Sequence, residues 1–224
     1  MSEVISAALN AISVMIVDDH PTVREGLARR IASQSDMSVC GEAADCVAAL
    51  ERYAQMRPDV VIVDLALKEG SGLDLIKDLH ARHHNVRAVV HSMYDESFYA
   101  DRALRAGAVG YVNKEADPDV VTDAIRVVMA GRVYLSETMT RQMLGRSCGK
   151  GDPFADPVAT LTDRQLQIFR MIGEGSGTRQ IAEQLHLSVH TVETHRENIK
   201  RKLGIASSGE LARRAVLWGH QASS

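Results

Sequence analysis

The run Pro58-Asp59-Val60-Val61-Ile62-Val63-Asp64 constrains the fold of this chain more than any other stretch. It holds four β-branched residues in a row between a proline and the turn Gly70-Ser71-Gly72, a pattern typical of a strand buried on both faces. Open α/β sheets with such strands bind their ligands at the carboxyl ends of the strands, which is where Asp64 stands. Asp64 is therefore a candidate functional carboxylate. The alternative, for this strand taken alone, is an aspartate that caps the next turn.

Four other short apolar runs have the composition of strands, and each expected strand is followed by a helical pattern. The expected strands span 13–17, 37–43, 60–63, 87–92 and 110–113, and the expected helices span 21–32, 45–55, 71–82, 97–106 and 118–130. Parallel neighbours need helical crossovers of one hand, so this alternation predicts an α/β fold with a doubly wound, five-stranded parallel sheet.

A second, smaller all-α domain is expected beyond residue 157. The predicted limits are an N-terminal extension over 1–11, the α/β domain over 12–131, a linker with a short helix over 132–157, and the helical domain over 158–224. Thr162 and Gln165 have capping-box spacing before one helix, and Ser188 caps a longer helix that reaches Leu203. Two helices joined by the short turn at 186–187 predict a helix-turn-helix.

Charge and cysteine content narrow the class of protein. Residues 158–224 carry nine basic and six acidic side chains, which leaves 17 basic and 23 acidic ones in the rest of the chain. This asymmetry is compatible with a cation-binding domain joined to a nucleic-acid-binding one. The three cysteines fit no zinc spacing, and no apolar run is long enough for a bilayer span, so we expect reduced thiols, no membrane contact and a cytoplasmic location.

Polar side chains follow four of the expected strands, and these strand ends should meet at one edge of the sheet. They are Asp18, Asp19, Asp64, Ser92 and Lys114. Three crowded carboxylates repel each other unless a cation neutralises them, and an all-oxygen site suits Mg²⁺. Such a cation would also clamp a phosphoryl group, with Lys114 and the Ser92 hydroxyl on its other side. For each residue alone, a cap or surface group is the alternative. Together they predict a phosphoryl-acceptor site at Asp64.

At this point the sequence resembles the response-regulator family of two-component signalling, of the NarL/FixJ type with a flavodoxin-like receiver and a LuxR-type DNA-binding domain. The resemblance covers nearly the whole chain and rests on the segments 14–20, 63–65, 70–72, 92–93, 107–111 with Lys114, and 161–164 through 202–204. It implies that Asp64 is phosphorylated by a sensor histidine kinase, and that Asp19, Asp64 and the Ala66 carbonyl bind Mg²⁺ with Asp18 assisting through water.

The resemblance also implies that Ser92 and Tyr111 form a switch pair. A phosphoryl group on Asp64 would draw the Ser92 hydroxyl inward, leaving space into which Tyr111 turns. Met93 and Tyr94 are bulkier than the family pattern and are placed to shield the site.

The long helix that begins after Ser188 is the expected DNA-binding element. A rotation of 100° per residue puts Val189, Val192, Arg196, Ile199 and Leu203 on an inward stripe. The family implies that the opposite face enters the major groove of double-stranded DNA, with Glu193, Thr194 and Glu197 toward bases and His195 and Lys200 toward phosphates. The candidate DNA-contacting residues are His190, Thr191, Glu193, Thr194, His195, Glu197, Lys200 and Arg201. A solvated charged helix face is the alternative.

These observations favour a phosphorylation-controlled transcription regulator that binds DNA as a homodimer, and not an enzyme in the ordinary sense. One alternative is a DNA-binding protein whose receiver serves only for dimerisation. Another is a phosphatase with an aspartyl-phosphate intermediate, but Asp18-Asp19 lacks the DxD spacing that such enzymes use.

Overall fold

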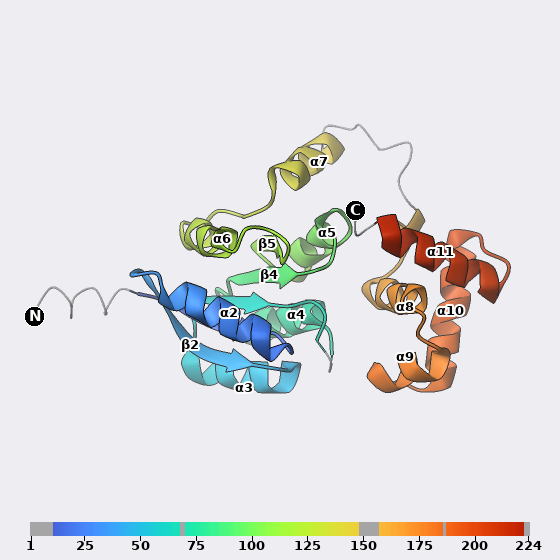
Figure 1. Ribbon diagram of the computed structural model, residues 1–224, viewed down its shortest axis with the longest axis horizontal. Coiled ribbons are helices and arrows are strands. Elements are labelled where there is room, and N and C mark those ends of the chain that lie inside the picture. The colour runs from blue at the N-terminus through green and yellow to red at the C-terminus, as the bar shows by residue number, and fades with distance from the viewer. Residues whose placement is uncertain (1–10, 68–69, 148–156, 186, 222–224) are drawn as a thin grey trace, which may run out of the picture. The chain divides into compact units, whose positions relative to one another are not determined.

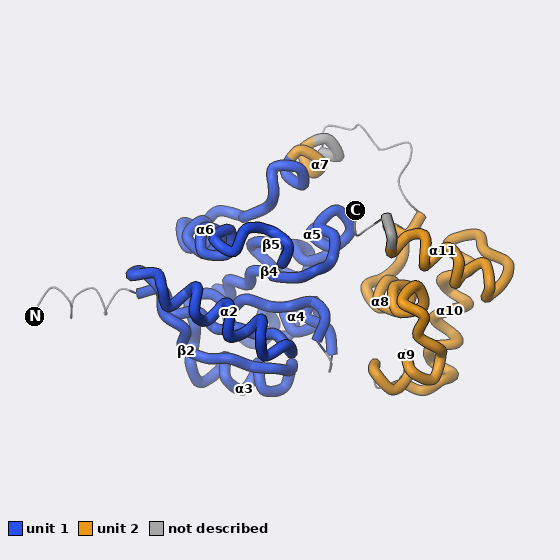
Figure 2. The backbone as a smooth tube through the Cα atoms, viewed as in Figure 1, with its two compact units in different colours: residues 1–140 blue, residues 141–224 orange. Residues whose placement is uncertain are grey.

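The computed structural model describes residues 11–67, 70–147, 157–185 and 187–221. It divides into two compact units, residues 1–140 and 141–224 (Figure 2).

The first unit is built on a five-stranded, all-parallel sheet, which confirms the predicted fold class (Figure 1). Its strands are β1 (Ile12–Val17), β2 (Met37–Ala43), β3 (Val60–Val63), β4 (Ala88–Ser92) and β5 (Gly110–Asn113). They are arranged in the order β2-β1-β3-β4-β5. The chain therefore moves outward in opposite directions from β1 and β3, and this pair is the switch point at whose carboxyl ends doubly wound sheets bind ligands.

Five helices cover the sheet. They are α2 (Pro21–Ala32), α3 (Cys46–Met56), α4 (Gly72–Arg82), α5 (Glu96–Ala106) and α6 (Asp119–Met129). Leu27 and Ile31 of α2 join Val121 and Ile125 of α6 in one buried cluster against alternate residues of the strands. The helices α3, α4 and α5 follow one another along the other face (Figure 1). Burial on both faces explains why the four residues of β3 are all apolar.

The segment after α6 extends the edge of the sheet. Tyr134 pairs with Gly110 in a single parallel bridge, where its N–H donates to the Val109 carbonyl at 2.9 Å. The helix α7 (Glu137–Ser147) follows, with Met139 buried in its first turn. The predicted linker over 132–157 stays a prediction, because its residues 148–156 lie outside the described part of the chain.

The second unit is helical. After the end of α7 it contains the short 3₁₀ helix η1 (Pro157–Thr160), α8 (Asp163–Gly173), α9 (Thr178–Gln184), α10 (Val189–Leu203) and α11 (Ser208–Gln221). The predicted caps are present: Thr162 and Gln165 form a capping box, and the Ser188 hydroxyl accepts the Thr191 N–H at 3.0 Å. The Trp218 ring lies 5.7 Å from the Phe169 ring in the core of this unit. The helix η1 was not predicted from the sequence.

Candidate functional site

Three buried carboxylates lie together at the switch point of the sheet. Asp18 and Asp19 follow β1, and Asp64 follows the neighbouring strand β3. The Asp64 N–H donates to the Val17 carbonyl at 2.8 Å, which joins the end of β3 to the end of β1. Only 1%, 8% and 2% of the surfaces of Asp18, Asp19 and Asp64 are exposed. One ligand atom from each of them and one from His20 lie within 4.8 Å of one another. Such crowding of negative charge requires cationic partners.

Lys114 supplies such a partner. Its ammonium donates to Asp18 Oδ2 at 2.6 Å and to Asp64 Oδ2 at 2.7 Å, and its side chain is 9% exposed. Burial opposes the charged form, but the Asp64 and Asp18 carboxylates outweigh burial and raise the pKa of Lys114. The ammonium therefore stays charged and bridges β1 and β3 from the end of β5.

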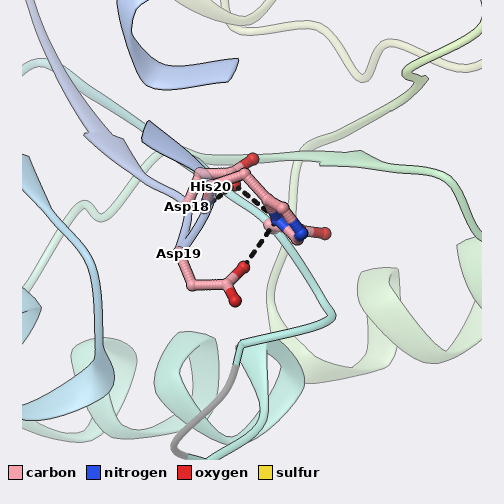
Figure 3. Close-up of side chains that lie close together, drawn as sticks. Asp18, Asp19 and His20 are labelled. Atoms are coloured by element: carbon pink, nitrogen blue, oxygen red, sulfur yellow. Dashed lines mark hydrogen bonds and ion pairs between the residues drawn. The ribbon is translucent and has the colours of Figure 1, made fainter. Parts of the chain in front are cut away.

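His20 lies directly beside Asp18 and Asp19, as Figure 3 shows. Its Nδ1 lies 2.8 Å from Asp19 Oδ1 and 3.4 Å from Asp18 Oδ1, and its backbone N–H donates to Asp18 Oδ1 at 2.8 Å. The sequence interpretation quoted His20 within the segment 14–20 but gave it no role in the site. The signal that could have found it is its place directly after the two aspartates, as the residue that precedes α2.

The loop after β3 bends back over Asp64. The backbone N–H of Ala66 donates to Asp64 Oδ1 at 3.2 Å, and the N–H of Gly72 donates to the Leu65 carbonyl at 3.2 Å. The hydrogen bond from Gly72 holds the start of α4 against the loop that carries Asp64.

Ser92 and Tyr111 lie at the same edge, at the end of β4 and in β5. Ser92 is fully buried, and its hydroxyl accepts the Tyr94 N–H at 3.4 Å. The Tyr111 ring is 1% exposed, and its hydroxyl donates to the Tyr94 carbonyl at 2.8 Å. Burial raises the pKa of Tyr111 well above its usual value. In this structure Tyr111 is therefore already inside, whereas the sequence interpretation had it turn inward on phosphorylation.

The two residues expected to shield the site differ in their surroundings. The Tyr94 ring packs on the Tyr99 ring with centroids 4.6 Å apart, so it is engaged by α5. Met93 is 54% exposed.

In the second unit, α10 presents the expected polar face. His190, Glu193, Thr194, Glu197 and Arg201 are exposed, while Val192 and Ile199 are buried. Val189, expected on the inward stripe, is 40% exposed, so that assignment was wrong. A helical wheel gives the direction of a side chain around the axis, but not whether a neighbouring helix reaches that far along it.

The candidates on the flanks of α10 are partly covered. The Lys200 ammonium lies 2.7 Å from Glu197 Oε1, and the Lys200 side chain is only 14% exposed. His195 is half-buried, and burial, with the nearby Arg164 guanidinium, lowers its pKa. The Thr191 hydroxyl lies 2.8 Å from the Ser188 hydroxyl at the helix cap.

Two family models match the chain, one for each unit. Residues 14–126 match the response regulator receiver domain, and residues 159–215 match the luxR family of bacterial regulatory proteins. The oxygen regulatory protein NreC of Staphylococcus carnosus is 35% identical over 210 residues, which cover 92% of this chain and 97% of NreC. NreC of Staphylococcus aureus strain MRSA252 is 33% identical over the same shares.

The chain belongs to the response regulators. It is a two-component response regulator with a receiver domain and a luxR-family regulatory domain, as the motifs predicted. The family is one of transcription regulators and not an enzyme class. The described residues contain no helix that is long and apolar enough to cross a membrane.

Solved structures agree with this assignment. A LuxR-family two-component response regulator from Aurantimonas sp. SI85-9A1 is 33% identical and covers 62% of this response regulator and 99% of its own chain, with a TM-score of 0.58. RcsB of Salmonella enterica serovar Typhimurium, solved bound to the promoter P1flhDC, has a TM-score of 0.69 and covers 92% of this chain and 98% of its own. RcsB is 23% identical, so this likeness shows the fold alone.

Beside the acidic site, His91 of β4 lines a pocket of about 550 Å³ between α2 and the segment after β5. Burial, followed by the charge of Lys114, lowers the pKa of His91 to about 4. Its Nδ1 is buried without a hydrogen-bond partner among the described residues. The imidazole is therefore neutral in the folded receiver at neutral pH.

We expect His91 to make the receiver acid-sensitive. An unfolded histidine titrates near 6.5 and the folded one near 4, so the unfolded chain binds more protons between these values. The contribution of His91 to stability is complete above pH 6.5 and is lost as the pH falls toward 4, by roughly 3 kcal/mol at most. Between pH 7 and 4.5, the free energy of unfolding should fall by about 2 kcal/mol less in His91→Gln than in the wild type. Urea unfolding measures both values. Equal losses in both proteins would contradict the assignment.

Proposed function

We propose that this response regulator is switched by phosphorylation of Asp64, with a sensor histidine kinase as donor and Mg²⁺ as cofactor, and that it then binds double-stranded DNA as a homodimer. The observation that carries the proposal is the buried set of Asp18, Asp19 and Asp64 with the Lys114 ammonium bonded to two of them. A response regulator that takes its phosphoryl group from a kinase and then binds DNA must reach both. We therefore propose that it acts in the cytoplasm.

The donor set fits a hard divalent cation. Three carboxylates offer the oxygen ligands that Mg²⁺ prefers, and their mutual repulsion falls when a cation binds. Asp19, Asp64 and the Ala66 carbonyl would hold the ion, with Asp18 acting through water. The bound ion would supply positive charge near the oxygens of the incoming phosphoryl group.

Each residue around Asp64 would have a separate role in the phosphoryl transfer. An Asp64 oxygen forms the bond to phosphorus as the bond between phosphorus and the donor imidazole nitrogen breaks. Lys114 already bonds Asp64 Oδ2, so its ammonium is in place to pair with a phosphoryl oxygen. The Ser92 hydroxyl would donate to a second oxygen. Movement of Ser92 would act on Tyr94, whose N–H bonds Ser92 and whose carbonyl holds Tyr111.

Phosphorylation would thus reach the surface through the Tyr94 segment, and not through burial of Tyr111, which is already inside. The repacked surface next to α5 is the candidate for pairing of two receivers. A symmetric dimer reads two half-sites about 34 Å apart, so pairing should raise affinity for a two-half-site operator far more than for one half-site.

The test compares the wild type with Asp64→Asn, each with and without a small phosphodonor and Mg²⁺. Mass spectrometry should find one added phosphoryl group on the wild type and none on the variant. Sedimentation and titration with a two-half-site operator should then show pairing and tighter binding for the labelled wild type only. If labelling changes neither property, the receiver serves as a dimerisation module. If the wild type is not labelled, or the variant is labelled equally, Asp64 is not the acceptor.

The proposed DNA-contacting residues are those of the exposed face of α10 and its flanks. They are His190, Thr191, Glu193, Thr194, His195, Glu197, Lys200 and Arg201. The two exposed glutamates can accept a hydrogen bond from cytosine N4 but repel phosphates. We therefore expect Glu193 and Glu197 to lower nonspecific affinity.

Replacing Glu193 by lysine should raise affinity for random DNA and steepen its salt dependence. Each additional phosphate contact adds about 0.9 to the slope of log affinity against log salt concentration. Glu51→Lys is the matched control, because it makes the same charge change at an exposed position of α3 in the receiver. Fluorescence anisotropy over a salt series measures both slopes. A slope that is the same for Glu193→Lys, Glu51→Lys and the wild type would place the α10 face away from DNA.

A further inference from the structure

We infer that Glu96 is a positioning residue that links the phosphoacceptor site to the helix α7, because it completes the cap of α7 from the start of α5. The inference rests on the phosphorylation switch proposed above and extends it to the segment that leaves the receiver. Ser136 precedes α7, and its backbone N–H donates to Glu96 Oε1 at 2.9 Å. Glu96 begins α5 and lies two positions after Tyr94, so this bond connects α7 to the segment that contacts Ser92.

The start of α7 has only half of a capping box of its own. Ser136 stands at the N-cap position, where its hydroxyl accepts the Met139 N–H at 3.1 Å. In a capping box the third residue of the helix is Glu or Gln, and its side chain accepts the N–H of the N-cap residue. The third residue of α7 is Met139, whose side chain is apolar and buried. Glu96 therefore supplies, from another segment, the carboxylate that this position of α7 lacks.

A second contact holds the same segment to the sheet. The Tyr111 N–H donates to the Tyr134 carbonyl at 2.9 Å, and the Tyr134 N–H donates to the Val109 carbonyl at 2.9 Å. Since β5 is hydrogen-bonded to β4, Tyr134 is fixed to the sheet, whereas Ser136 is fixed to α5. These two anchors are only two residues apart, so any shift of α5 relative to β5 strains the short segment between them.

Phosphorylation would move one of these anchors and leave the other in place. The Ser92 hydroxyl, drawn toward a phosphoryl oxygen on Asp64, would carry the Tyr94 segment and the start of α5 with it. The strand β5 stays in its ladder with β4. The bond between Glu96 and Ser136 spans this moving boundary, and a hydrogen bond weakens steeply when its atoms separate or tilt. Phosphorylation of the receiver therefore releases the cap of α7 and loosens its first turn.

Hydrogen exchange in the full-length protein, read by mass spectrometry of peptides from α7, tests this release. Phosphodonor and Mg²⁺ should raise the exchange rate of the wild-type α7 amides by about 10-fold, the factor expected when one hydrogen bond to a charged group is lost. Glu96→Ala should show the raised rate before labelling and no further rise after it. Glu96→Gln keeps a side-chain oxygen that can accept the Ser136 N–H, so it should restore the wild-type behaviour.

Glu51→Ala is the matched control, because it removes the same carboxylate from an exposed position of α3. It should leave the exchange of α7 unchanged. The β1 and β3 amides report in each sample whether the receiver is folded, and the mass of the intact protein reports whether Asp64 is labelled.

Each failure has a separate signature. If unlabelled Glu96→Ala exchanges at α7 as slowly as the wild type, Glu96 does not hold this helix. If labelling leaves the exchange of wild-type α7 unchanged, phosphorylation does not release the cap, and this comparison decides even if Glu96→Ala does not fold. If the wild type is not labelled at Asp64, the proposed switch fails and the release fails with it, whereas the unlabelled variants still decide whether Glu96 caps α7.

Discussion

Replacing Lys114 by methionine is expected to destabilise the receiver by about 3 to 5 kcal/mol in the absence of divalent metal. The ammonium is the shared partner of Asp18 Oδ2 and Asp64 Oδ2 at 2.6 and 2.7 Å. Both carboxylates are almost completely buried, so its loss leaves negative charge in a site with little water. Methionine keeps most of the length of the side chain, and the effect is therefore one of charge and not of packing.

Mg²⁺ should restore part of the lost stability, and more in Lys114→Met than in the wild type. In the variant the ion no longer competes with an ammonium for the Asp64 carboxylate. Binding at a concentration about 100 times the dissociation constant adds about 2.7 kcal/mol. Hydrogen exchange of the β1 and β3 amides, measured with and without Mg²⁺, reports the stability of this unit alone.

The matched control is Lys77→Met on α4. Lys77 pairs with Asp74 at 3.2 Å, but its side chain is 48% exposed, and exposed pairs contribute about 0 to 1 kcal/mol. Lys77→Met should change the exchange of the same amides little, with or without Mg²⁺. If Lys114→Met behaved like this control, the two buried hydrogen bonds of Lys114 would not neutralise the site.

The sequence predicted the acidic site because, in a parallel sheet, the position of a residue at the end of a strand also fixes the edge of the sheet at which it lies. Parallel strands bring their carboxyl ends to one edge, so Asp18, Asp64 and Lys114 could be placed together from strand boundaries alone. Apolar runs such as β3 define those boundaries well. The caps did the same for the helical unit, where Thr162 and Ser188 cap the starts of α8 and α10 as predicted.

Features that depend on the direction of a side chain were not predictable in this way. His20 lies in the turn between β1 and α2, and strand periodicity no longer fixes where a turn residue points. The sequence places Tyr111 in β5, but its inward position depends on the Tyr94 carbonyl, which accepts its hydroxyl. Val189 illustrates the corresponding limit for helices, since it is 40% exposed although the helical wheel puts it on the inward stripe.

The approach of α4 to Asp64 also escaped the sequence interpretation, which used Gly70-Ser71-Gly72 as a turn and as one segment of the family resemblance. A Cβ at Gly72 would collide with the Asp64 carbonyl oxygen and lie 2.8 Å from Leu65 Cα. Both obstacles are backbone atoms of the loop that carries Asp64, so a side-chain rotation cannot relieve the clash. Gly72 is required because it allows the start of α4 to touch this loop.

Gly72→Ala should therefore destabilise the receiver by about 3 kcal/mol, in the upper part of the range for overpacked cores. The substitution should also slow labelling of Asp64 by a phosphodonor, because relief of the clash moves the loop away from Asp19 and Lys114. Hydrogen exchange of the β3 amides measures the first effect, and mass spectrometry of the labelled protein measures the second.

Gly26→Ala makes the same chemical change at an open position. Gly26 lies within α2, and a Cβ there would meet nothing within 4 Å. Alanine is the better helix former, so this variant should gain about 0.5 to 1 kcal/mol and label normally. The two glycine variants thus have expected effects of opposite sign, and the difference of about 4 kcal/mol isolates the steric term. Equal stability of Gly72→Ala and the wild type would mean that α4 does not press on the Asp64 loop.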